Sequence, residues 1–147
     1  MFILRHRPLT LSLQRHLSSS VDGVGLLTTL RESSGVVVID VRDQIEIATT
    51  GRLTDKFEML EVRDDVLYGE ITLAQIMEGG FTLPDDEFED AFEFSKPPKD
   101  ALLVFSCAAG VRSASAQKMA IENGYSNTIN YLGGANEFMK KTEDVPQ

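Results

Sequence analysis

Two unbroken apolar runs constrain the fold of this 147-residue chain most strongly. The first is Val36 to Ile39, four β-branched residues in a row, and the second is Ala101 to Phe105. Continuous runs of this kind are typical of strands that are buried on both faces in a parallel sheet. Because segments with helical spacing separate the runs, the sequence predicts an α/β fold with a mostly parallel central sheet and helices on both faces.

The helical segments follow from apolar spacing and from stop signals such as Gly51 and Asn123-Gly124. Helices are expected over Val24 to Glu32, Asp43 to Ala48, Asp85 to Phe94, Arg112 to Glu122, and from Gly133-Gly134 through Lys140. A last strand is expected from Thr128 to Tyr131. Residues 52–70 lack a clean apolar period and buried anchors, so we predict an atypical insertion there, the least ordered part of the domain.

The charge of the chain excludes one class of partner. The formal net charge is -9, whereas nucleic-acid binders need clustered Lys and Arg for phosphate contacts. We read the acidic body as an ordinary solvated surface. The apolar runs are also far shorter than the ~20 residues that a membrane-spanning helix requires, so we expect no membrane segment.

The N-terminal segment differs from the rest in composition. Residues 1–20 contain Arg5, Arg7 and Arg15 and no acidic residue. This fits a mitochondrial transit peptide, and a disordered tail is the alternative. We therefore expect the folded domain to span residues 21–147, in mitochondria or otherwise in the cytoplasm.

The chain has a single cysteine, Cys107, so an internal disulfide is impossible. Both histidines, His6 and His16, lie in the N-terminal segment, and no cluster of Cys, His and carboxylate residues suggests a metal site. We expect no metal and no cofactor. A lone cysteine is more often a buried apolar residue than a nucleophile, so only its context can argue for reactivity.

That context is a strand-loop-helix junction. Cys107 follows the second apolar run almost at once, and Ala108, Ala109 and Gly110 lead into a helix. Successive backbone N–H groups in such a loop can surround the sulfur and favour its anionic form, and Arg112 adds a positive charge nearby. The small residues let the loop turn tightly, and we expect them to leave the sulfur open.

The body of the chain has no histidine to act as a base for the thiol. Activation would therefore have to come from the loop itself. This suits a reaction in which no alcohol or water is deprotonated, such as moving a sulfur atom from a donor to a thiolate and on to a nucleophilic acceptor.

At this point the residues resemble a family. The loop Cys107 to Ser113 is similar to the C-x-x-G-x-R-S active-site loop of single-domain rhodaneses, which are thiosulfate sulfurtransferases. Three more pieces stand in the family's order: Val36 to Arg42 with its D-x-R, Lys96 to Ser106 before the loop, and G-Y-S-N and Y-L-G-G at 124–127 and 131–134. The resemblance covers about residues 24–141.

The resemblance implies a rhodanese-like fold and roles for matching positions. Cys107 would carry sulfane sulfur as a persulfide. The substrate would be cradled by the loop N–H groups, which are those of Ala108, Ala109, Gly110, Val111 and Arg112. The Arg112 side chain would also help to close the loop and attract anionic donors. Supporting roles fall to Asp40, Arg42 and Ser113, the first two more as a structural ion pair than as chemical groups.

The implied substrates are small molecules. The donor would be thiosulfate or a small persulfide, and the acceptor a thiol or cyanide, with a sulfur-relay protein as a further partner. The chain departs from the family after Gly51-Arg52-Leu53, where the usual proline-glycine turn is absent and one wall of the pocket is in question. Phe138 stands where the family usually has Trp.

Two alternatives remain at this stage. Cysteine phosphatases also use a strand-loop-helix junction, but they place Arg six residues after Cys, whereas the spacing from Cys107 to Arg112 is five. The shorter loop fits one sulfur atom better than a phosphoryl group. The second alternative is a non-catalytic, rhodanese-like binding or regulatory module whose altered segment no longer forms a donor pocket.

Overall fold

We describe the computed structural model over residues 19–143. Five strands form one sheet in the order β1-β5-β4-β2-β3, and every neighbouring pair is parallel. The elements in chain order are β1 (Ser19–Val21), α2 (Gly23–Glu32), β2 (Val36–Asp40), α3 (Gln44–Thr50), η2 (Leu53–Lys56), β3 (Leu67–Glu70), α4 (Leu73–Met77), η3 (Gly80–Thr82), α5 (Asp85–Phe92), β4 (Leu102–Ser106), α6 (Val111–Glu122), β5 (Thr128–Tyr131) and α7 (Gly134–Glu143).

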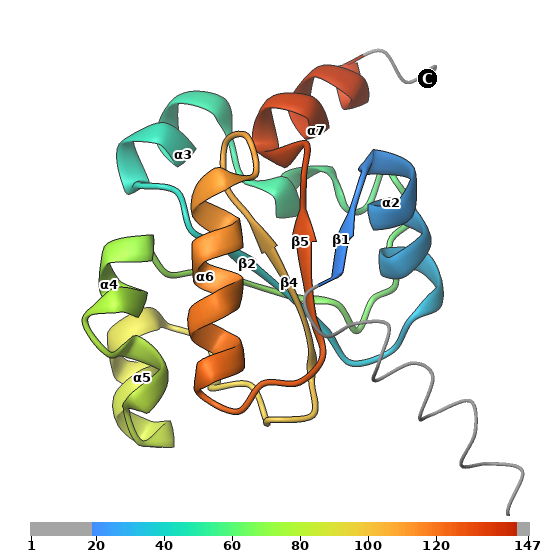
Figure 1. The fold of residues 1–147 in the computed structure, drawn as a ribbon. Helices are drawn as coiled ribbons and strands as arrows, with labels where there is room; N and C mark the ends of the chain where they lie inside the picture. Colours follow the sequence, from blue (N-terminus) through green and yellow to red (C-terminus); the bar gives the residue numbers. More distant parts are fainter. Residues whose placement is uncertain (1–18, 144–147) are drawn as a thin grey trace, which may run out of the picture.

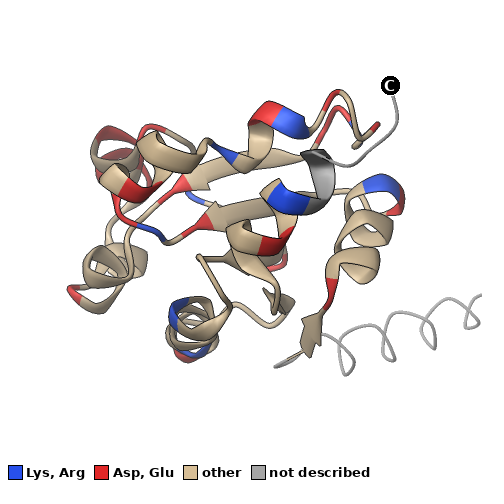
Figure 2. Ribbon diagram, turned by 90° about the horizontal axis from the view of Figure 1, so that it is seen from above, with Lys and Arg blue, Asp and Glu red and all other residues tan. Residues whose placement is uncertain are grey.

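The sheet separates two apolar cores. One face packs against α4, α5 and α6, and its core includes Ile39, Phe88 and Phe105. The other face packs against α2, η2 and α7, with Leu26 and Val104 in its core. Helices on both sides of the sheet are visible in Figures 1 and 2. This confirms the predicted α/β class.

The two apolar runs become the central strands. Every residue of β2 and β4 is buried, and Val36 pairs in register with Leu102. Each strand extends one residue beyond the predicted run, to Asp40 and Ser106, which are polar but buried. Both strands therefore end side by side at one edge of the sheet, where loops form the usual site of an α/β fold.

The predicted domain boundary after residue 20 is two residues too late. Ser19 and Ser20 belong to β1, where they pair with Ile129 and Asn130 of β5. A three-residue edge strand that begins with two serines has no apolar run, so no local pattern predicts it. The remainder of the predicted N-terminal segment, residues 1–18, lies outside the described residues.

The reading of residues 52–70 as a segment without buried anchors is wrong. Leu53 has only 1% of its surface exposed, and Leu60 and Val62 are also buried against the same core. The segment ends in β3, which adds the edge strand beside β2. Burying a leucine stabilises a fold by about 1.5–3 kcal/mol, so these side chains anchor the segment. The short helix α4 that follows was not predicted.

The surface of the described residues is mixed in charge. Acidic positions are spread over several helices, and basic positions are interspersed among them (Figure 2). No helix of residues 19–143 is long and apolar enough to cross a membrane. Within the same residues, no three His, Cys, Asp or Glu side chains are grouped so that they could hold a metal ion.

Candidate functional site

Cys107 lies at the carboxyl end of β4, between that strand and α6. The turn from strand to helix passes through Gly110, whose φ of 88° is in the left-handed region that glycine adopts without strain. A Cβ at this position would lie 2.5 Å from the carbonyl oxygen of Leu132. Glycine is therefore needed both for the backbone angle and for the close approach of the chain after β5.

The sulfur atom of Cys107 is surrounded by neutral hydrogen-bond donors. Backbone N–H groups of Gly110 and Ser113 donate to Sγ at 3.1 and 3.4 Å. The Ser113 hydroxyl lies 3.3 Å from Sγ. The structure thus brings Ser113 and the N–H of Gly110 together around the sulfur.

These contacts change the acidity of the thiol. Burial by itself raises the pKa of Cys107, because it disfavours the charged form. The hydrogen bonds from the Ser113 side chain and from the N–H groups of Ser113, Ala109 and Gly110 act in the opposite direction. Together they outweigh burial and lower the pKa of Cys107 below its ordinary value, so the loop favours a thiolate.

The expectation of an open sulfur is wrong. Only 1% of the Cys107 surface is exposed, whereas Ala109 and Val111 on either side of Gly110 are exposed. The small residues allow the tight turn, but that same turn folds the backbone over the sulfur. The turn therefore shields Sγ from solvent in this structure.

The outward carbonyl groups of the loop are also bound. The N–H of Ala135 donates to the Cys107 carbonyl at 2.7 Å, and that of Asn136 donates to the Ala108 carbonyl at 3.1 Å. Both donors belong to the first turn of α7, whose free N–H groups need acceptors. Gly134 permits this docking, since a Cβ there would lie 2.4 Å from the Ala108 carbonyl oxygen. The carbonyls are held outward, and the N–H groups can face the sulfur.

A buried side chain completes this support. Asn130 on β5 donates from Nδ2 to the Gly110 carbonyl at 3.1 Å. It is buried between β5 and the start of α6, where the N–H of Gly110 is the donor nearest to Sγ. Asn130 therefore fixes the Gly110–Val111 peptide group, which directly follows the Gly110 N–H that donates to Sγ.

Arg112 does not face the sulfur as a free cation. Its Nη1 and Nη2 atoms bind the two carboxylate oxygens of Glu46 on α3 at 2.7 and 2.8 Å. Both side chains are about one third exposed, at 32% and 35%. Hydrogen bonds from Arg112 and from the N–H of Asp43 lower the pKa of Glu46 to about 2. The pair ties the loop to α3 and neutralises the charge that was expected to attract anionic donors.

Asp40 and Arg42 form a buried ion pair at the end of β2. Arg42 Nη2 lies 2.7 Å from Asp40 Oδ2, and the two side chains are 2% and 0% exposed. Arg42 also donates to the hydroxyl of Thr50 and the carbonyl of Gly51, and the Tyr68 hydroxyl donates to Asp40 at 2.9 Å. The pair thus holds α3 and β3 against the end of β2, beside the strand that carries Cys107.

The sequence of this chain is similar to those of known proteins. The family model of the rhodanese-like domain matches residues 24–141. The chain belongs to the rhodanese-like family. The mitochondrial thiosulfate sulfurtransferase RDL2 of Saccharomyces cerevisiae is 33% identical over 132 residues, which cover 88% of this chain and 89% of that protein.

Two further comparisons concern the same yeast. The crystal structure of its single-domain sulfurtransferase RDL2 superposes with a TM-score of 0.64 at 27% identity, over 88% of this chain and 95% of that one. A thiosulfate:glutathione sulfurtransferase is 41% identical over 64 residues, covering 44% of this chain and 46% of that protein. The prediction of a rhodanese-like enzyme is thereby confirmed at the level of the family.

Glu46, Asn130 and Asn136 are among the supporting residues of this rhodanese-like chain that the sequence reasoning missed. Glu46 was placed on the short helix after β2 without a role, because the helix dipole already accounts for a carboxylate in the first turn. Asn130 and Asn136 had no signal beyond their closeness to Gly133-Gly134. Their contacts join residues far apart in the chain, and only the fold reveals them.

Proposed function

We propose that this chain is a sulfurtransferase that moves sulfane sulfur from thiosulfate or a small persulfide to a thiophilic acceptor through a persulfide on Cys107. The observation that carries the proposal is the set of neutral donors on Sγ, from Gly110 N, Ser113 N and Ser113 Oγ. Such donors stabilise an anionic sulfur without a proton acceptor.

The proposed reaction has two steps. The Cys107 thiolate attacks the outer sulfur of thiosulfate, an S–S bond forms, and the bond to the sulfonate sulfur breaks with release of sulfite. A thiolate or cyanide then attacks the outer sulfur of the persulfide, and Cys107 leaves as the thiolate. Because Cys107 is the nucleophile in the first step and the leaving group in the second, a lowered pKa helps the second step directly.

The supporting residues act through position. Ser113 donates to the sulfur, while Asn130 and the start of α7 hold the loop carbonyls away from it. The N–H groups of Ala108, Ala109, Val111 and Arg112 are the remaining candidates for contacts with the outer sulfur. The Arg112–Glu46 pair closes the loop against α3, and the Asp40–Arg42 pair maintains the neighbouring strand end.

The packing of residues 52–70 favours the enzyme over a non-catalytic binding module. That alternative depended on a lost wall, whereas Leu53, Leu60 and Val62 are buried and β3 completes the sheet.

Replacement of Cys107 by Ser tests the proposal. Cys107→Ser should abolish thiocyanate formation from thiosulfate and cyanide, and should abolish the gain of one sulfur atom in the protein's mass after incubation with thiosulfate. As a matched control, Ser126→Cys in the Cys107→Ser protein adds an exposed thiol outside the loop and should not restore turnover. Retained activity in Cys107→Ser, or its return with the Ser126→Cys thiol, contradicts the proposed role of the loop.

We further propose a mitochondrial location, with the folded domain beginning at β1. The name of the yeast relative RDL2 includes that compartment, and residues 1–18 contain three arginines and no acid. Residues 1–18 fused to a fluorescent reporter should bring it to mitochondria. A diffuse cytosolic signal contradicts this part of the proposal.

A further inference from the structure

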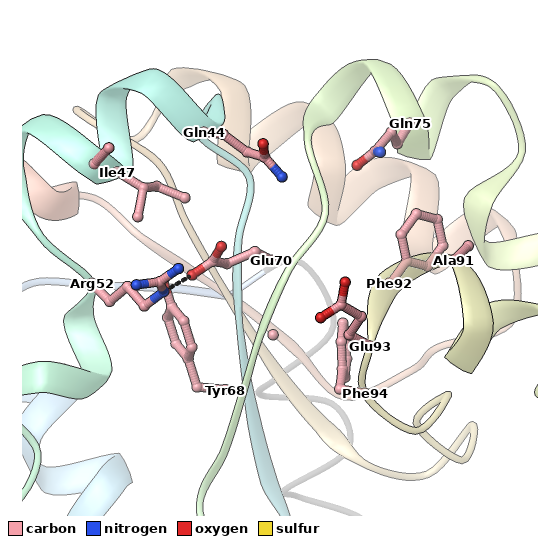
Figure 3. Close-up of a pocket in the computed structure, with 12 residues that line it drawn as sticks. Gln44, Ile47, Arg52, Tyr68, Glu70, Gln75, Ala91, Phe92, Glu93 and Phe94 are labelled. Carbon is pink, nitrogen blue, oxygen red and sulfur yellow. Dashed lines mark hydrogen bonds and ion pairs between the residues drawn. The ribbon is translucent and has the colours of Figure 1, made fainter.

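A cavity of about 640 Å³ lies along the edge of the sheet at β3, and none of the residues from Cys107 to Ser113 lines it. Its walls come from α3 on one side of the strand and from the end of α5 on the other, with Gln44 and Gln75 at its upper rim (Figure 3). Phe92 and Phe94 form an apolar wall on the α5 side.

The floor of the cavity is a strand edge with unused backbone groups. In the described sheet β3 pairs only with β2. The N–H of Ile71 donates to the Asp40 carbonyl on β2, so alternate residues such as Gly69 also face β2. Successive residues of a strand point their backbone N–H and C=O groups to opposite sides, so those of Tyr68 and Glu70 face the free edge. An added peptide can pair with them as it does in other β-additions.

The two sides of this edge carry opposite charges. Glu93, at the end of α5, points its carboxylate into the cavity, and this carboxylate makes no hydrogen bond or ion pair with other described residues (Figure 3). Arg52, on the α3 side, binds Glu70 Oε2 through Nε at 2.7 Å. That bond leaves the terminal amino groups of the Arg52 guanidinium for a ligand.

We propose that this cavity binds a short zwitterionic peptide, of two or three residues with both ends free. Glu93 would bind its ammonium group, Arg52 its carboxylate, and the edge of β3 its amide groups. Glu70 and Glu93 would repel a simple anion, and Arg52 would repel a simple cation. A ligand with a single charge therefore does not match the charges of the cavity. The proposal stands apart from the sulfur chemistry, because the cavity is lined without the Cys107 loop.

Triglycine is the probe that tests this site. Titration into isotope-labelled full-length protein should shift the amide NMR signals of Tyr68 and Glu70 with saturation. Triglycine that is acetylated and amidated at its ends has the same backbone without charges, and it should not produce these shifts at equal concentration. Acetate and ethylamine, each with one of the two charges, should also fail. Binding should be unchanged in Cys107→Ser.

Variants then locate the charges. Glu93→Gln and Arg52→Gln should each weaken triglycine binding about two- to fivefold, as expected for the loss of one charge contact in a partly open site. Glu89→Gln, one turn earlier on α5, and Arg63→Gln, outside the cavity, are matched controls and should leave binding unchanged. Absent shifts, equal shifts from the capped peptide, or equal effects of Glu93→Gln and Glu89→Gln would each overturn the proposal.

Discussion

The loops that follow β4 and β2 lie at the same edge of the sheet, but they hold their charged atoms in opposite ways. After β4, the sulfur of Cys107 is bound by peptide N–H groups and a hydroxyl, all of them neutral. After β2, the carboxylate of Asp40 is bound by the guanidinium of Arg42. Both groups are buried, and both need partners because burial disfavours charge.

The difference matches what each loop has to do. An ion pair such as Asp40–Arg42 fixes both partners, which suits a strand end that must not move. A sulfur that gains and loses a neighbouring atom needs donors that tolerate either state, and peptide dipoles supply this without a counter-charge. The second arginine of the site, Arg112, is likewise occupied by Glu46 rather than by the sulfur.

The largest expected effect comes from breaking the ion pair after β2. Asp40→Ala leaves Arg42 buried without its partner and should lower the free energy of unfolding by about 3–5 kcal/mol. That corresponds to a fall of roughly 10 °C in the melting temperature, measured by calorimetry. Asp65→Ala, which removes an exposed partner of Arg63, should hardly change it. Similar losses in both variants would contradict a structural role for the buried pair.

A smaller loss of stability is expected when a methyl group is added to the loop after β4 by the substitution Gly110→Ala. Gly110→Ala strains the backbone and presses Cβ against the Leu132 carbonyl, so it should destabilise by more than the ~1–2 kcal/mol of a left-handed alanine. It should also slow sulfur transfer, because the N–H of Gly110 moves away from Sγ. Gly124→Ala has a similar φ of 96° but meets only the Lys99 side chain at 3.7 Å. Equal stability and activity in the two variants would mean that the contact with Leu132 is unimportant.

The smallest effect concerns the neutralised Arg112. Glu46→Gln removes the opposing charge and should lower the KM for thiosulfate about two- to fivefold, the range of one partly exposed ion pair. Glu122→Gln makes the same change at the far end of α6 and serves as the control. A KM that is unchanged, or changed equally by both substitutions, would show that Glu46 does not compete with the donor for Arg112.

The same pair predicts how stability depends on acid. The pKa of Glu46 is about 2 in the folded chain, below its ordinary value of 4.5. The unfolded chain therefore binds the proton more readily between these values, and the contribution of Glu46 is complete above pH 4.5 and lost as the pH falls toward 2. Between pH 4.5 and 2, the free energy of unfolding measured with denaturant should therefore fall less steeply with decreasing pH in Glu46→Gln than in the unmodified protein. An identical slope would contradict the pairing.

Two properties decide which parts of the fold and of the site the sequence predicts. They are the burial of each strand and the separation along the chain of the residues in contact. The central strands were predicted because β2 and β4 are buried on both faces, and apolar runs record that directly. The edge strands were missed because their faces are mixed; Leu67 of β3, for example, is 54% exposed. Periodicity cannot reveal a strand that alternates so weakly.

The residues of the site also fall into a group that the sequence predicts and a group that it does not. Cys107, Gly110 and Ser113 stand within seven residues, so the loop motif contains them all. Glu46 reaches Arg112 across 66 positions, and Asn130 reaches Gly110 across 20. Such contacts are set by the packing of α3 and β5 around the loop, and no local pattern encodes them. The burial of the sulfur was not predicted either, because it too depends on how the elements around the loop pack.

The pH dependence of Cys107 alkylation by iodoacetamide tests the central claim that neutral donors activate the sulfur. We predict a midpoint below the ordinary thiol value of ~8.5 in the unmodified protein. Ser113→Ala, which removes the hydroxyl contact, should raise that midpoint more than Arg112→Gln, because Glu46 already neutralises the arginine. A midpoint at or above the ordinary value, or a larger shift in Arg112→Gln than in Ser113→Ala, would contradict the account.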